Sequence, residues 1–187
     1  MSKVAIQGNA SGTGTLTIAA PSTNTDRTLT LPDEAGTVDT LQRAGNVLQV
    51  VKATYSTYTQ ISSTSYVDTG LSASITPTSA TSKVLVLVNQ TGWTGRDSSY
   101  GAVYYVNLVR DSTEISNNSY EYRAGLAGDG RIRFPVSSNF MFLDTPSTTS
   151  STTYKTQVKL DTTADSALMR LHLVPSVDSI VLLEIAA

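Results

Sequence analysis

Val84-Leu85-Val86-Leu87-Val88 is an unbroken apolar run bounded by Lys83 and Asn89. Side chains of a β-strand point alternately to opposite faces, so a strand with this sequence is apolar on both of its faces. Such a run is typical of a central strand that is covered twice. Ile180-Val181-Leu182-Leu183 has the same character. We expect one face to pack on a second sheet, and the other on a neighbouring subunit or under a short loop of the same chain.

Strand-like segments continue on both sides of this run, separated by clusters of Gly, Pro, Asn and Ser. Eight strands are predicted, at residues 47–54, 71–76, 83–89, 101–110, 131–143, 153–160, 167–174 and 179–186. Eight strands in about 140 residues fit a two-sheet antiparallel sandwich such as a jelly roll. The predicted fold class is all-β, with residues 46–187 as a jelly-roll head domain. We expect the core or an oligomer interface to contain Val84, Val86, Val88, Tyr104, Tyr105 and Leu182.

The N-terminal segment alternates threonine with apolar residues, in Thr15-Leu16-Thr17-Ile18 and again in Thr28-Leu29-Thr30-Leu31. With Val4 to Ile6, these stretches predict a ribbon of three short strands. Its large apolar side chains are few: Val4, Ile6, Leu16, Ile18, Leu29 and Leu31. An isolated ribbon rarely offsets its ordering entropy. Residues 1–45 are therefore predicted to be an anchor and linker that identical chains or another protein must cover.

The composition excludes several classes of function. Ser and Thr fill 24 and 28 of the 187 positions, whereas charged residues make up only 15%. The net charge of −2 comes from singly scattered residues, so we predict neither nucleic acid nor a membrane as a partner. The absence of cysteine excludes disulfides, thiolate chemistry and Cys-based metal sites. No cofactor or metal is predicted, because no acidic calcium loop or complete nucleotide-binding loop is present.

Catalysis is not predicted either. His172 is the only histidine, and alternation in its strand places it beside Arg170 on a polar face. We interpret it as a solvent-facing or subunit-contact residue instead of a general base. The carboxylates are scattered, and no pair shows the spacing of a glycosidase, which needs two held about 5 to 9.5 Å apart. No apolar run reaches the length of a signal peptide or a membrane span, so we expect synthesis in a cytoplasm.

Two polar segments rich in aromatic residues suggest a glycan-binding surface. Aromatic faces stack on sugar rings while Arg and Asp side chains bind hydroxyl groups, and loops on a rigid sandwich often carry such sites. The candidate contacts are Trp93, Arg96, Asp97, Tyr100, Tyr120, Tyr122 and Arg123. The alternative interpretation is that these aromatic residues close the ends of the sandwich or line a subunit contact.

Several stretches resemble virion proteins of tailed bacteriophages. The N-terminal similarity lies in Gly12-Thr13-Gly14-Thr15-Leu16-Thr17-Ile18-Ala19-Ala20-Pro21 and Ala35-Gly36-Thr37-Val38. Ser65-Tyr66-Val67-Asp68-Thr69-Gly70-Leu71 and the closing Leu182-Leu183-Glu184-Ile185 are similar to C-terminal jelly-roll heads of tail-fibre and head-decoration proteins. The resemblance implies a homotrimeric head of tumour-necrosis-factor or C1q shape, displayed on the virion surface. It also implies attachment to other virion proteins through the N-terminal ribbon.

The resulting hypothesis is a non-enzymatic virion structural protein: a short trimeric tail fibre or adhesin that contacts host surface polysaccharide. A capsid decoration protein, either a cement or a head fibre, is the alternative. A polysaccharide depolymerase is a more remote alternative, because no catalytic residue can be named from the sequence.

Overall fold

The computed structural model describes residues 11–15, 17, 19, 22–26, 28, 43–97, 102–122, 132–172 and 176–187, without the side chains of residues 102, 118–122 and 132. The chain divides into two units, Met1–Val38 and Asp39–Ala187. The apolar positions of the predicted ribbon, Val4, Ile6, Leu16, Ile18, Leu29 and Leu31, lie outside the described residues.

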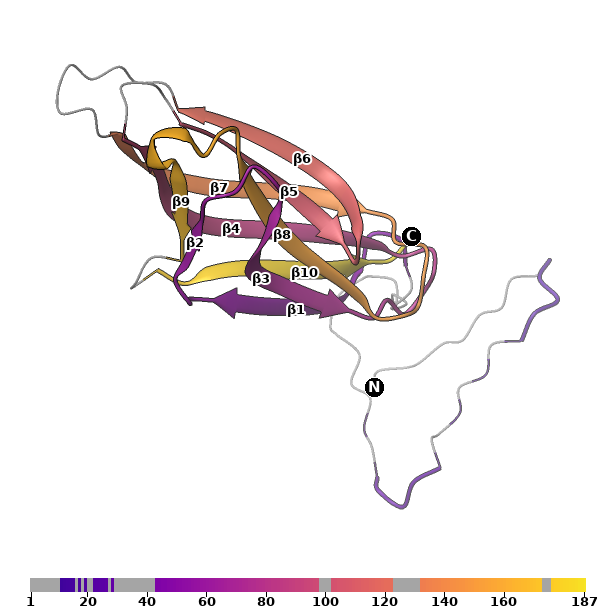
Figure 1. Cartoon of the computed structure of the whole chain (residues 1–187). Helices are drawn as coiled ribbons and strands as arrows, with labels where there is room; N and C mark the ends of the chain where they lie inside the picture. Colours follow the sequence, from indigo (N-terminus) through magenta and orange to yellow (C-terminus); the bar gives the residue numbers. More distant parts are fainter. Residues whose placement is uncertain are drawn as a thin grey trace. The chain divides into compact units, whose positions relative to one another are not determined.

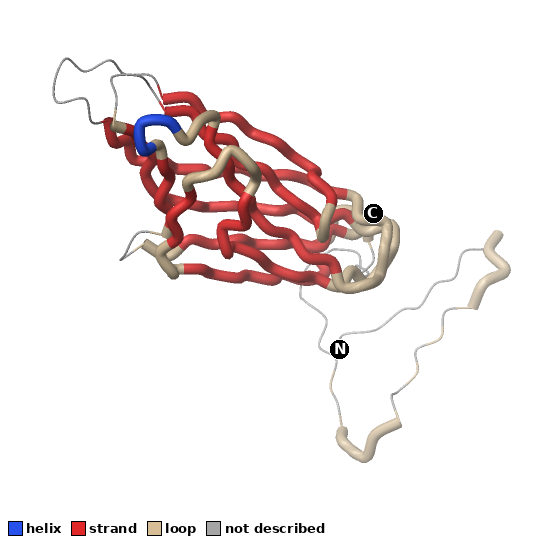
Figure 2. Tube along the Cα trace, viewed as in Figure 1, coloured by secondary structure: helices blue, strands red, loops and turns tan. Residues whose placement is uncertain are grey.

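The second unit is built almost entirely of strands, which Figure 1 labels and Figure 2 colours red. The strands are β1 (Val47–Tyr55), β2 (Thr59–Ile61), β3 (Val67–Ile75), β4 (Lys83–Arg96), β5 (Ala102–Arg110), β6 (Thr113–Tyr122), β7 (Ile132–Asp144), β8 (Thr152–Leu160), β9 (Leu168–Leu171) and β10 (Asp178–Ile185). A 3₁₀ turn, η1, covers Ala164–Ser166.

The strands form two antiparallel sheets. Sheet A has the order β1-β10-β4-β9-β2, with β7 also paired to β4, and sheet B has the order β3-β8-β5-β6. Because β7 pairs with β4 from Val84 to Arg96, β9 and β10 must share the other edge of β4. They do so in succession: β10 pairs with residues 83–89 and β9 with residues 92–95. β9 and β10 therefore occupy one strand position in sheet A. β1 and β2 likewise occupy one position, because β1 pairs with β10 and β2 pairs with β9.

This arrangement is a jelly roll. With β1/β2 and β9/β10 each counted as one position, the eight positions in chain order form sheets 1-8-3-6 and 2-7-4-5. This is the interleaved order of two Greek keys. The two layers face each other in Figure 1, with β3, β8, β5 and β6 in one and β1, β10, β4 and β7 in the other. The predicted all-β antiparallel sandwich is confirmed.

The core lies between the inner faces of the two sheets. On β4 the alternation that begins at Val84 continues through Val86 and Val88, all of which are buried. Leu71, Leu108 and Tyr154 of sheet B pack in the same cluster. A second cluster, around Tyr104 and Met169, fills the other end of the sandwich. The expected core residues Val84, Val86, Val88, Tyr104 and Leu182 are buried, whereas Tyr105 is half-buried on the outer face of sheet B.

Each of the eight predicted segments overlaps an observed strand, but β2 and β6 were not predicted. The strand β6 was missed because Thr113–Tyr122 contains only one aliphatic residue, Ile115, and gives no apolar alternation. The two predicted strands at 167–174 and 179–186 are present as β9 and β10, which lie in succession along one edge of β4. The strand β4 also extends past residue 89 to Arg96, through residues such as Gly92 and Thr94 that lack large apolar side chains.

Buried carboxylates hold the sandwich at one end. Asp144 of β7 accepts hydrogen bonds from Arg110 Nη1 at 2.9 Å and from Tyr154 Oη at 2.7 Å, and so joins sheet A to sheet B. Burial raises the pKa of Tyr154, and its hydrogen bond to Asp144 raises it further. Glu184 of β10 is fully buried and accepts bonds from Gln49 Nε2 at 2.6 Å and from Thr78 N at 2.7 Å. These bonds tie the β3–β4 connection to the end of sheet A.

We predict that Glu184→Gln lowers stability at neutral pH and flattens its acid dependence. Burial opposes ionisation of Glu184, but the bonds from Gln49 and Thr78 outweigh it, so the pKa in the folded protein is lowered. A lowered folded pKa gives a stabilisation that is complete above the unfolded value of about 4.3 and is lost as pH falls below it. The loss at pH 7 should be about 1–3 kcal/mol. Urea unfolding between pH 7 and pH 3 measures both effects, and parallel pH profiles for the two proteins would contradict the assignment.

Candidate functional site

A polar hollow of about 410 Å³ lies on the outer face of sheet B. Its volume falls in the lower part of the range of small-molecule sites, about 300–1,000 Å³. The lining side chains come from β5, β6, β8, the β5–β6 turn and the connection from β2 to β3: Tyr66, Asn107, Val109, Asp111, Ser112, Glu114, Lys155 and Gln157.

Strand register brings these side chains together. On β5, Val106 and Leu108 point into the core, so Asn107 and Val109 point outward. Asn107 lies opposite Asn117 on β6 and Gln157 on β8. Val109 lies opposite Glu114 and Lys155. Residues that are directly opposite in an antiparallel pair share a face, so two short cross-strand rows form the base of the hollow.

Asn107 is the most buried polar side chain of the hollow. The residue is 2% exposed, and its Nδ2 atom donates to Glu114 Oε2 at 2.8 Å. Its Oδ1 atom has no hydrogen-bond donor within the described part of the chain. A buried acceptor without a donor costs roughly 1–3 kcal/mol. Asn107 is therefore an acceptor whose hydrogen-bonding capacity is not filled by the surrounding residues.

The charges around the hollow are unevenly matched. Asp68 accepts hydrogen bonds from Lys155 Nζ at 2.8 Å and from Gln157 Nε2 at 2.6 Å. Burial opposes ionisation of Asp68, but these two bonds and the lysine charge outweigh it, so the pKa of Asp68 is lowered. The charge of Lys155 is therefore balanced by Asp68, which does not line the hollow. Among the described residues no cation forms an ion pair with Asp111 or Glu114, so the hollow carries excess negative charge.

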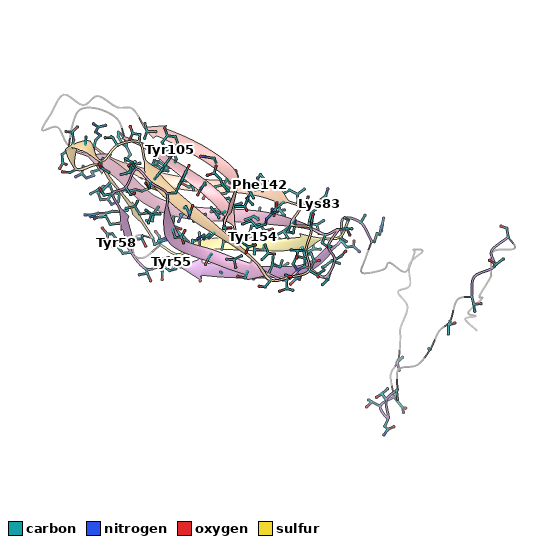
Figure 3. The ribbon with its side chains drawn as sticks, turned by 45° about the vertical axis from the view of Figure 1, so that its right-hand side comes forward. Tyr55, Tyr58, Lys83, Tyr105, Phe142 and Tyr154 are labelled. Carbon is teal, nitrogen blue, oxygen red and sulfur yellow. The ribbon has the colours of Figure 1, made fainter. Side chains whose placement is uncertain are left out.

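An aromatic wall borders the hollow. Tyr66 donates from Oη to Asn117 Oδ1 at 3.0 Å. Burial raises the pKa of Tyr66, and the charge of Glu114 adds to this effect despite the bond to Asn117. Lys159 Nζ lies 4.7 Å from the ring centroid of Tyr66 and 5.0 Å from that of Tyr105. Tyr105 is among the residues labelled in Figure 3. Both rings are thereby fixed on the outer face of sheet B.

The predicted glycan contacts whose side chains the structure describes, Trp93, Arg96 and Asp97, do not line the hollow. Trp93 is on the outer face of sheet A, with the guanidinium carbons of Arg170 and Arg133 at 4.8 Å and 5.2 Å from its ring centroid. Asp97 joins this group through a 2.9 Å bond from Arg133. Arg96 is three residues after Trp93 on β4, so its side chain starts from the other face of the strand, and it forms an ion pair with Asp165 at 2.8 Å. The side chains of Tyr100, Tyr120, Tyr122 and Arg123 are outside the described residues.

Sequence reasoning missed the hollow because its residues are single polar side chains in separate segments. One signal was present, since Asn107 interrupts the otherwise apolar or aromatic run Val103–Val109. An amide in the middle of such a strand needs a polar partner. The pairing of β5 with β6 and β8, which supplies Glu114 and Gln157, could not be read from that signal alone.

The expectation that His172 faces solvent is wrong. His172 follows β9, has a φ of 57° and is 0% exposed. Its Nε2 atom lies 3.0 Å from the carbonyl oxygen of Thr69, and its Nδ1 atom lies 2.6 Å from Asp178 Oδ2. Because a carbonyl oxygen can only accept, the hydrogen bond to Thr69 requires a proton on Nε2. Strand alternation failed here because the chain leaves strand geometry between β9 and β10.

The surroundings of His172 explain its role. Asp178 is 1% exposed, and its Oδ1 atom accepts from Thr91 N at 3.0 Å and Thr91 Oγ1 at 2.8 Å. The ring of Tyr55, labelled in Figure 3, packs edge-on against His172 with centroids 4.7 Å apart. This cluster connects β3 and β4 to the end of β1 and to the facing ends of β9 and β10. It is enclosed, so we assign it a structural role at the break between β9 and β10.

Within the described residues, no group of three or more His, Cys, Asp or Glu side chains is arranged to hold a metal ion. The same part of the chain contains no helix that is long and apolar enough to cross a membrane.

No family model matches the chain, and no curated protein matches it. Among solved structures it is similar to the insecticidal delta-endotoxin Cry8Ea1 of Bacillus thuringiensis, at 15% identity and a TM-score of 0.36, over 68% of this chain and 19% of that one. It is also similar to the VP2 subviral particle of infectious bursal disease virus, at 15% identity and a TM-score of 0.37, over 74% of this chain and 33% of that one. The chain thus spans a third or less of these neighbours, and likenesses of this size carry no functional argument.

We predict that His172→Ala destabilises the sandwich by about 3–5 kcal/mol, because it leaves the Oδ2 atom of the buried Asp178 carboxylate without the imidazole that contacts it. Asp178→Asn should cost less when His172 is already absent than when it is present. A double-mutant cycle from urea unfolding at pH 7 measures this coupling. Additive effects of the two substitutions would show that the 2.6 Å contact contributes nothing to stability.

Proposed function

We propose that this protein is a non-enzymatic virion structural protein, a short trimeric tail fibre or adhesin on the particle surface. In this proposal residues 46–187 form the projecting head, and residues 1–45 form the ribbon that attaches it to other virion proteins. The jelly-roll topology and the resemblance of both segments to phage virion proteins support this assignment. One surface feature of the head carries the argument for assembly.

That feature is an apolar patch on the outer face of sheet A. Cross-strand register places Val50, Leu183, Leu85 and Leu143 in one row, and Val181, Leu87 and Met141 in the next. Met141, Val50 and Leu143 are 73%, 60% and 52% exposed. Contiguous exposed apolar surface of this kind marks interaction sites in soluble proteins. We define the apolar patch as Val47, Val50, Leu85, Leu87, Met141, Leu143, Val181, Leu183 and Ile185.

Identical subunits are the occupants that best fit this patch. The patch lies over β4 and β10, the strands whose sequences are apolar on both faces, and ends at β7, an edge strand of sheet A. Within the described residues of the second unit, no segment covers Met141 or Val50, whose side chains are mostly exposed. A homotrimer with these faces turned inward would bury the apolar side chains and protect the β7 edge from uncontrolled pairing.

We predict that purified protein sediments as a trimer of the 19.8 kDa chain. The double substitution Met141→Asp and Leu143→Asp should convert it to a folded monomer, because charge would replace apolar contact between subunits. Ser137→Asp with Asn139→Asp is the matched control, on the same strand and the same outer face but beyond the patch. Sedimentation velocity measures assembly, and circular dichroism checks folding. A wild-type monomer, or a control that dissociates equally, would contradict the proposed interface.

The proposed location is tested on the intact particle. Antibody against residues 46–187, detected by immunogold electron microscopy, should label the tail. Labelling of the shell would replace the fibre assignment with the alternative, a capsid decoration protein. Absence of label from purified particles would refute the proposal that this is a virion protein.

A further inference from the structure

The hollow on sheet B and the apolar patch on sheet A lie on opposite outer faces of the sandwich. The two sheets pack through their inner faces, where Val86 and Tyr154 belong to the same core cluster. The hollow is lined from β5, β6 and β8, whereas the patch is built on β1, β4, β7 and β10. Assembly through the apolar patch would therefore leave the hollow open to an external ligand.

The chemistry of the hollow matches a ligand rich in hydroxyl groups. A hydroxyl both donates and accepts hydrogen bonds. The lining offers the acceptors Asp111 and Glu114 and the side-chain amides of Asn107 and Gln157. Asn107 Oδ1 lacks a donor among the described residues, and a ligand hydroxyl is a donor that could supply it. Tyr66 adds an aromatic ring at the border, on which the apolar face of a sugar can stack.

The charges of the hollow favour a neutral sugar over an acidic one. Lys155 is paired with Asp68 at 2.8 Å, and Lys159 lies against the rings of Tyr66 and Tyr105. Asp111 and Glu114 remain on the lining, and neither forms an ion pair with a cation of the described residues. An acidic sugar would place its carboxylate next to these two groups. A neutral sugar would meet only hydrogen-bonding partners.

We propose that this hollow binds a neutral sugar residue of a surface polysaccharide, held by Asn107, Glu114 and Gln157 and stacked on Tyr66. The inference rests on the proposed adhesin function, because it names the receptor class and the residues that contact it. It moves the binding site from the surface around Trp93, where the sequence pattern placed it, to the opposite sheet.

The test uses the full-length protein on an array of immobilised oligosaccharides. The neutral set contains glucose, galactose, mannose and rhamnose units, and the acidic set contains uronic and sialic acids. We expect binding to at least one neutral oligosaccharide. In solution titration with that oligosaccharide, Tyr66→Ala and Glu114→Gln should each weaken binding tenfold or more. Trp93→Ala is the control on the other sheet and should change affinity less than twofold.

Each other outcome overturns the inference. Binding to acidic oligosaccharides alone would contradict the charge argument, and no binding by a folded protein would refute the site. Loss of binding in Trp93→Ala but not in Tyr66→Ala would move the site to sheet A. Thermal melting of each variant separates lost binding from lost folding, and Glu114→Gln keeps the size of an exposed side chain. A trimer that labels the particle but binds no neutral sugar refutes this inference alone, whereas a monomer refutes the proposed function.

Discussion

The central strand β4 is the element on which the rest of the head depends. One edge pairs with β7 from Val84 to Arg96, and the other pairs first with β10 and then with β9. Its inner face supplies three fully or nearly fully buried valines to the core. Burial of an apolar side chain of this size contributes about 1.5–3 kcal/mol. A strand paired along both edges and buried on one face has a fixed register, and it passes that register to every neighbour in sheet A.

The break between β9 and β10 shows how the sandwich accommodates irregular backbone. The chain leaves the sheet at His172, whose positive φ is unusual for a residue other than glycine. The side chain then fills the gap with a polar cluster formed by Asp178, Thr91 and the Thr69 carbonyl. Gly92 permits the close approach of β9, because a Cβ atom there would lie 2.1 Å from the Arg170 carbonyl oxygen. The lack of a side chain at Gly92 and the hydrogen bonding around His172 thus maintain the pairing of β4 with β9 and β10 across the break.

The two outer faces of the sandwich differ in chemistry. Sheet A combines an apolar patch with a group of arginines around Trp93, whereas sheet B presents amides, carboxylates and lysines around a hollow. Both faces have a well-packed core beneath them, so their side chains are held on a rigid support. This separation suits a protein that contacts its own copies with one face and an external ligand with the other, as the two proposals require.

The sequence alone determined the fold class and most of the strands, because period-two alternation and doubly apolar runs such as Val84–Val88 report directly on pleated structure. It could not identify β6, because the polar sequence of this strand gives no apolar alternation, although the strand pairs with β5. The environment of His172 was also beyond local rules, since Asp178 and Thr69 meet it only when β3 and β10 are packed. The hollow could not be predicted for the same reason: Asn107 and Glu114 face each other only in the register of the β5–β6 hairpin, and Gln157 joins them only because β8 pairs with β5. Alternation is a property of one strand, whereas a binding surface is a property of several, and tertiary pairing alone decides which strands lie together.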